Sequence, residues 1–103
     1  MKQLIALGTL LFTFNAAAGC PSAVPARTPE IPNGAAASEQ SMLDAMAAVR
    51  SYVQTIEAYL DCRDFALSSR RYDELVDKAS DAAGAYNREL VRFQQREAAF
   101  AQN

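Results

Sequence analysis

Apolar residues recur at alternating spacings of four and three through most of residues 38–103, which is the period of one face of an α-helix. The first stripe comprises Met42, Met46, Val49, Val53, Ile56, Leu60 and Leu67. The second stripe comprises Tyr72, Val76, Ala79, Ala83, Tyr86, Leu90, Phe93 and Phe100. Ser38 and Ser68 stand before the stripes, where Ser is a favoured N-cap. The pattern predicts two long helices, at about residues 38–67 and 69–101.

The short link between these helices indicates an all-α fold in which they pack as an antiparallel hairpin. Folding the chain about Ser68 brings Leu60 near Val76 and Val53 near Ala83, so that the two stripes face each other. Two helices alone bury little apolar surface, and domains of this size usually need a disulfide, a metal or a partner. We therefore expect a further stabilising element.

The prolines are confined to residues 20–37, which we predict to form a proline-rich extended arm. Proline fixes φ and restrains the residue before it, so this arm is expected to be polyproline-like rather than helical or flexible. Near its end, Pro32 followed by Asn33 and Gly34 predicts a chain reversal, because proline pre-sets the first central position of a turn.

The first residues have the pattern of an export signal. Lys2 supplies a positive charge, residues 4–14 form an uncharged and largely apolar run, and small residues follow up to Gly19. The run is too short to span a membrane, which takes about 20 apolar residues. We predict a signal peptide at residues 1–19 and a periplasmic or secreted mature protein. Loss of Lys2 changes the formal net charge from −2 to −3, which argues against nucleic-acid binding.

Two cysteines in an exported chain, Cys20 and Cys62, predict one structural disulfide. The arm is long enough to bring Cys20 to Cys62, because it spans roughly 56 Å as polyproline while the helix from Ser38 to Cys62 rises about 36 Å. It can therefore run back along the hairpin and place Val24 and Ile31 on the open flank. Closing such a loop stabilises a domain by about 4 kcal/mol.

A second interpretation of Cys20 remains open. The sequence Ala17-Ala18-Gly19-Cys20 resembles a lipobox, in which Cys20 is lipidated and becomes the first mature residue. Ala17 stands where lipoboxes usually have Leu, and lipidation would leave Cys62 as an odd thiol in an oxidising compartment. The alternative is a lipoprotein anchored to the envelope, and only in that case do we expect contact with a membrane.

The mature chain resembles a group of small secreted proteins of Gram-negative bacteria to which no activity is assigned. The resemblance covers most of the mature residues and rests on short motifs: Cys20-Pro21, Ile31-Pro32-Asn33-Gly34, Tyr59-Leu60-Asp61-Cys62, and Tyr72 with Leu75-Val76. Members of the group tend to have Asp-Gly where this chain has Asn33-Gly34, which leaves the turn intact. The resemblance implies export and a helical architecture, and no functional residues.

The composition offers little for catalysis. The chain contains no His, the commonest general base and a frequent metal ligand, and no Gly-rich phosphate loop. We therefore expect no enzymatic activity, no cofactor and no metal. Asp73, Asp77 and Asp81 recur at four-residue spacing and can attract a divalent cation, but Ca²⁺ takes roughly six or more oxygen ligands. Acidic residues early in a helix also complement its dipole.

A basic ladder lies near the end of the second predicted helix, at Arg88, Arg92 and Arg96. It can form a surface for an anion or an acidic partner, because arginine pairs well with phosphate. It can equally compensate the helix dipole on a solvated face. Arg63 interrupts the first stripe and is expected to pair with Asp73 across the hairpin.

These observations predict a small exported structural or interaction protein of the bacterial periplasm. We expect either a protein partner on an exposed helix face or self-association into a four-helix bundle. The lipoprotein anchored through Cys20 is the first alternative, and an anion- or cation-binding surface on the second helix is the second.

Overall fold

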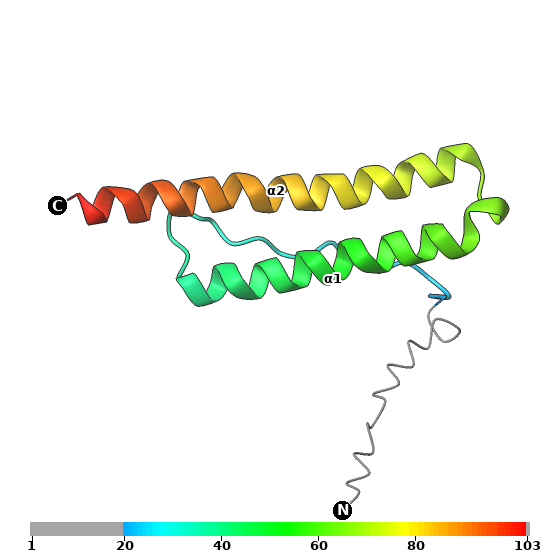
Figure 1. Ribbon diagram of the computed structural model, residues 1–103, viewed down its shortest axis with the longest axis horizontal. Helices are drawn as coiled ribbons and strands as arrows, with labels where there is room; N and C mark the ends of the chain where they lie inside the picture. Colours follow the sequence, from blue (N-terminus) through cyan, green and yellow to red (C-terminus); the bar gives the residue numbers. More distant parts are fainter. Residues whose placement is uncertain (1–19, 103) are drawn as a thin grey trace, which may run out of the picture.

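A computed structural model describes residues 20–102 and contains two α-helices joined by one turn of 3₁₀ helix. The elements are α1 (Glu39–Arg63), η2 (Asp64–Ala66) and α2 (Ser69–Ala101). The chain turns back after η2, and α2 lies alongside α1 (Figure 1). No strand occurs within the described range. The prediction of an all-helical fold with two packed helices is confirmed, and the predicted signal peptide lies outside the described residues.

Both helices begin at the serine caps that the sequence predicts. The Ser38 hydroxyl accepts a hydrogen bond from the Ser41 backbone N–H at 3.0 Å. The Ser68 hydroxyl accepts one from the Arg71 N–H at 3.1 Å. These bonds satisfy N–H groups that have no partner within the first turn of a helix. Local side-chain chemistry therefore fixes where α1 and α2 start.

The first helix ends earlier than its stripe predicts. We expected helical residues up to 67, whereas α1 stops at Arg63 and the chain tightens into η2. Tighter 3₁₀ turns are common at helix C-termini, where the last carbonyls lack helical partners. Leu67 is half-buried beyond η2, while Phe65 on η2 is exposed. The apolar period therefore continues past the end of α1, into residues that connect α1 to α2.

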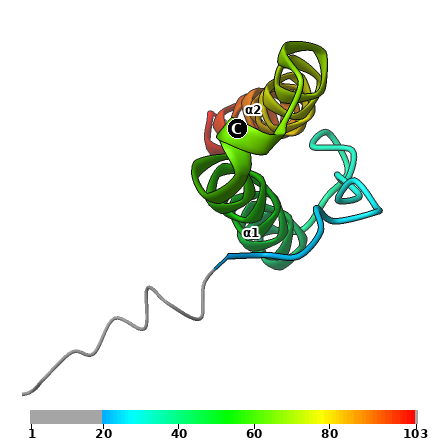
Figure 2. The same cartoon turned by 90° about the vertical axis from the view of Figure 1, so that its right-hand side faces the viewer.

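The proline arm, residues 20–37, runs back along one flank of the helix pair. Figure 1 shows it lying lengthwise beside the helices, and the end-on view in Figure 2 shows that it covers one side only. Val24 and Ile31 are half-buried and pack against the core, as predicted. All prolines of the arm are half-buried as well: Pro21, Pro25, Pro29 and Pro32. The arm is therefore a third packing element.

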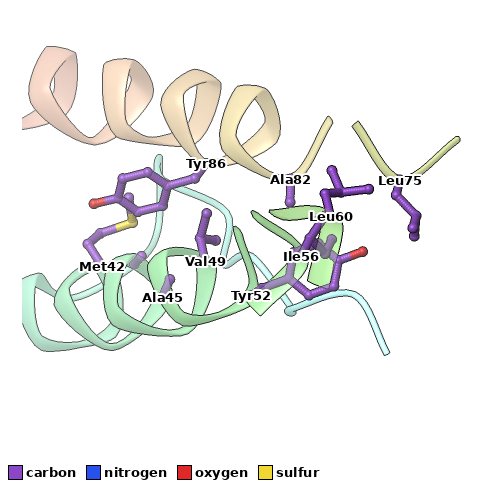
Figure 3. Close-up of a cluster of buried hydrophobic side chains, with 10 residues drawn as sticks. Met42, Ala45, Val49, Tyr52, Ile56, Leu60, Leu75, Ala82 and Tyr86 are labelled. Carbon is purple, nitrogen blue, oxygen red and sulfur yellow. The ribbon is translucent and has the colours of Figure 1, made fainter. Parts of the chain in front are cut away.

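The buried seam is shifted toward the arm relative to the predicted stripes. Its members on the two helices are Met42, Ala45, Val49, Tyr52, Ile56, Leu60, Leu75, Ala82 and Tyr86 (Figure 3). The stripes predicted Met46 and Val53 as core residues, whereas their neighbours Ala45 and Tyr52 are the buried ones. Leu75, which has no exposed surface, belongs to neither predicted stripe. Both helices thus turn their arm-side residues inward, because the core is shared among three segments rather than two.

Gly34 lies against the backbone of α2. The chain turns near the predicted motif but two residues later: the Ala36 N–H donates to the Asn33 carbonyl at 3.0 Å, so Gly34 rather than Pro32 is the first central residue. Gly34 does not have a positive φ, so the turn does not require glycine for its backbone conformation. A Cβ atom at Gly34 would lie only 1.8 Å from the backbone oxygen of Glu89. Glycine is needed here because the arm approaches the helix backbone so closely.

We predict opposite effects for alanine at two glycines. Gly34→Ala would force the turn away from α2 and lower the free energy of unfolding by about 2 kcal/mol. Gly84→Ala is the control, because the added methyl group on α2 would meet nothing closer than 3.6 Å. It should raise stability by about 0.5–1 kcal/mol through helix propensity. Urea unfolding followed by circular dichroism checks both values, and a neutral Gly34→Ala would contradict the close approach.

Candidate functional site

One flank of the helix pair is left uncovered by the described residues. Figure 2 shows the arm on the opposite side. Two shallow hollows of about 380 and 350 Å³ lie between α1 and α2, and no arm residue lines either of them. We call this surface the free flank. Its apolar floor consists of Met46, Val53, Tyr72, Val76, Ala79 and Ala83.

The floor of the free flank comes from residues that the sequence predicts as core. Tyr72 and Val76 remain 40% and 41% exposed, although both belong to the second apolar stripe. Leu43, two helical turns before Arg50, and Val91, one turn after Asn87, are also exposed and extend the apolar surface. The apolar stripes are therefore wider than the interface that the chain makes with itself, and the surplus gathers on one side.

Charges of both signs border the free flank at different ends. Glu57 and Asp61 line the hollow nearer the turn, and Arg50 lines the other hollow. Gln54 and Asn87 also line the second hollow and add hydrogen-bonding groups. Among residues 20–102, none of these three charged side chains takes part in an ion pair. The free flank thus has an apolar centre with one acidic and one basic end.

The two cysteines lie close together at the start of the arm. Cys20 is exposed and Cys62, in the last turn of α1, is half-buried, and the sulfur atoms are not bonded. A hydrogen bond with the Cys20 thiol, together with desolvation, raises the pKa of Cys62 above its ordinary value. A raised pKa leaves less thiolate at neutral pH, which is unfavourable for a nucleophile. The two thiols are thus close enough to interact, and the interaction favours the protonated form of Cys62.

Arg63 holds the arm next to this thiol pair. Its Nε donates a hydrogen bond to the Pro21 carbonyl at 3.3 Å, and its guanidinium lies 5.6 Å from the centre of the Tyr59 ring. The expected pairing with Asp73 is not found among the described ion pairs. The arginine that interrupts the first stripe therefore contacts the arm, through the Pro21 carbonyl.

The three arginines of the basic ladder lie in different environments. Arg96 donates from Nη2 to the Ala37 carbonyl at 2.5 Å, and its guanidinium lies 5.0 Å from the Phe93 ring centre. Arg92 pairs with Glu89 at 3.1 Å. Of the three ladder arginines, Arg88 alone is exposed and forms no ion pair with the described residues. The structure therefore does not present the three arginines as one open cationic surface.

The acidic ladder stays on the exposed surface of α2, at Asp73, Asp77 and Asp81. Within residues 20–102, no group of three potential ligands is placed to hold a metal ion. None of the described helices is both long and apolar enough to span a bilayer. Comparison of the chain with family models, with curated proteins and with solved structures finds no match. The geometry of the free flank and of the arm therefore carries the functional hypothesis.

Several contacts of the arm cannot be predicted from the sequence. Glu89 accepts a hydrogen bond from the Gly34 N–H at 3.0 Å, and Arg96 binds the Ala37 carbonyl. These partners are 55 and 59 residues apart in the chain. The sequence gives no indication of these pairings, because the path of the arm along the helices decides which helical residues it contacts. The one available hint is Gly34, whose missing side chain permits a close approach.

We predict that Arg96 contributes to stability whereas Arg88 does not. Arg96→Met removes a charge-assisted hydrogen bond to the buried Ala37 and should lower the free energy of unfolding by about 2 kcal/mol. Arg88→Met removes the same charge from an exposed position and should change it by less than about 0.5 kcal/mol. Urea unfolding of both variants measures the difference. Equal losses would mean that Arg96 does not fasten the arm.

Proposed function

We propose that this protein is an exported, non-catalytic interaction module of the bacterial periplasm that self-associates through its free flank. In this proposal the helix pair is an antiparallel hairpin, one side of which is closed by the arm. The other side packs on a second copy and completes a four-helix bundle. The observation that carries the proposal is the apolar floor of the free flank, with Tyr72 and Val76 about two-fifths exposed.

A second copy fits the free flank better than a strongly charged ligand does. Burial of the floor residues removes apolar surface from water, which is the main driving force for association. Helix pairs with surplus apolar residues on one face complete their core by packing on another pair. The rim of the flank carries Arg50 as well as Glu57 and Asp61, so it attracts neither polyanions nor polycations as a whole. A surface with both signs can be complementary to itself.

The proposal includes a Cys20–Cys62 disulfide as the tether of the arm. The Cys20 thiol lies within hydrogen-bonding distance of Cys62, and the Arg63 contact with Pro21 holds the arm beside it. In an oxidising compartment, exchange with an external disulfide would remove both thiol hydrogens and form the bond. The tether would keep the arm on its own flank and leave one flank for the second copy.

Lipidation of Cys20 is the competing assignment. Cys20 is exposed at the beginning of the arm, where an acyl chain would meet no obstacle from the described residues. A lipid on its sulfur would exclude the disulfide and would place the module on a membrane surface. The free flank would be unchanged, so this alternative alters the anchoring of the protein and not its self-association.

We predict a disulfide in protein recovered from its native compartment. Its intact mass should be that of residues 20–103, or of the chain starting at Gly19, less two hydrogen atoms. Neither cysteine should react with iodoacetamide until a reductant is added. A Cys62→Ser variant should fall in stability by about 4 kcal/mol through loss of the loop closure. A mass increased by a diacylglycerol group, or two alkylated thiols, would contradict the tether.

We predict a dimer whose affinity depends on Val76. Val76→Gln replaces an exposed apolar side chain of the floor and should raise the dimer dissociation constant about tenfold. Phe100→Gln is the matched control, because Phe100 is 67% exposed in the last turn of α2 and lines neither hollow of the free flank. Sedimentation equilibrium of the purified protein gives both constants. A monomer at all concentrations would refute self-association.

A further inference from the structure

We propose that two copies pack antiparallel through their free flanks, so that the acidic end of each lies against the basic end of the other. This inference rests on the proposed self-association and specifies its geometry. The twofold axis would pass near Val53 and Ala83, perpendicular to the helices. Arg50 of each copy would then face Glu57 of the second copy, and the contact would occur twice in the dimer.

The two hollows locate the axis. Val53 and Ala83 are the residues that line both of them, so they mark the centre of the free flank. Along α1, Arg50 lies three residues before Val53 and Glu57 lies four residues after it. At about 1.5 Å per residue, both charges are roughly 5 Å from the centre along the helix. A twofold rotation about this point therefore exchanges the positions of Arg50 and Glu57.

The alternative arrangement leaves these charges without ionic partners. In a parallel dimer, with its axis along the helices, α1 would lie opposite α2 of the second copy. The α2 residues that line the two hollows are uncharged, so Arg50 and Glu57 would be desolvated without an opposite charge to pair with. In the antiparallel dimer both pairs are attractive, and each Arg50 is also nearer to Asp61 of the second copy. Charge complementarity thus selects the antiparallel dimer.

Intramolecular partners do not compete for these charges. Arg50, Glu57 and Asp61 form no ion pair in residues 20–102, whereas the arginines that fasten the arm are engaged with Pro21 and Ala37. Gln54 and Asn87 lie near the centre of the flank and can exchange hydrogen bonds across the axis. The acidic and basic ends are therefore available to a second copy at no cost to the monomer.

Charge-reversal variants test the arrangement by sedimentation equilibrium at low salt. Arg50→Glu and Glu57→Arg should each raise the dimer dissociation constant about tenfold, because each creates two repulsive pairs. The double variant Arg50→Glu/Glu57→Arg should return to within about threefold of the starting value. An equimolar mixture of the two single variants should form heterodimers. High salt should reduce all of these differences.

Two matched controls change the net charge in the same way on the arm. Arg27→Glu and Glu30→Arg alter exposed residues that line neither hollow of the free flank, and they should leave the constant unchanged. Thermal unfolding confirms that every variant remains folded. A dimer that tolerates both single reversals would overturn the antiparallel geometry and leave self-association standing. A monomeric starting protein would instead refute the proposed function itself, so the two failures are distinguishable.

Discussion

Charged side chains of the helices fasten the backbone of the arm at three points. Arg63 binds the Pro21 carbonyl near its start, Glu89 accepts the Gly34 N–H at its turn, and Arg96 binds the Ala37 carbonyl at its end. Bonds of this kind, with one charged partner, are roughly twice as strong as neutral ones. An extended segment has no internal hydrogen bonds, so such contacts give it one defined course.

The position of the arm determines which half of each apolar stripe is buried. Val24 and Ile31 of the arm pack against a core in which Ala45 and Tyr52 of α1 and Leu75 of α2 are buried. The residues on the other half of the stripes remain in contact with solvent. One short arm cannot cover every apolar residue of two long helices in a domain of this size. The free flank is thus a direct consequence of covering the helix pair on one side only.

The two flanks suit different tasks. The arm flank is fastened by directional hydrogen bonds and by the close approach of Gly34 to the backbone of Glu89, which together define a single arrangement. The free flank has no such locking groups and instead offers an apolar floor between an acidic and a basic end. The directional contacts that hold the arm are thereby concentrated on one side of the molecule. The proposed self-association would use the other side.

The sequence by itself determined the local structure of this protein. Ser38 and Ser68 specify the helix starts, the apolar period specifies helices, and Asn33-Gly34 marks a reversal, although the turn lies two residues later than Pro32 predicts. Each of these features depends on residues only a few positions apart. Only the tertiary structure decided how wide stripes are divided between core and surface, why position 34 must be glycine, and which arginine of the ladder serves the arm. These outcomes depend on contacts between residues far apart in the chain, and helical periodicity fixes a face without saying what will cover it.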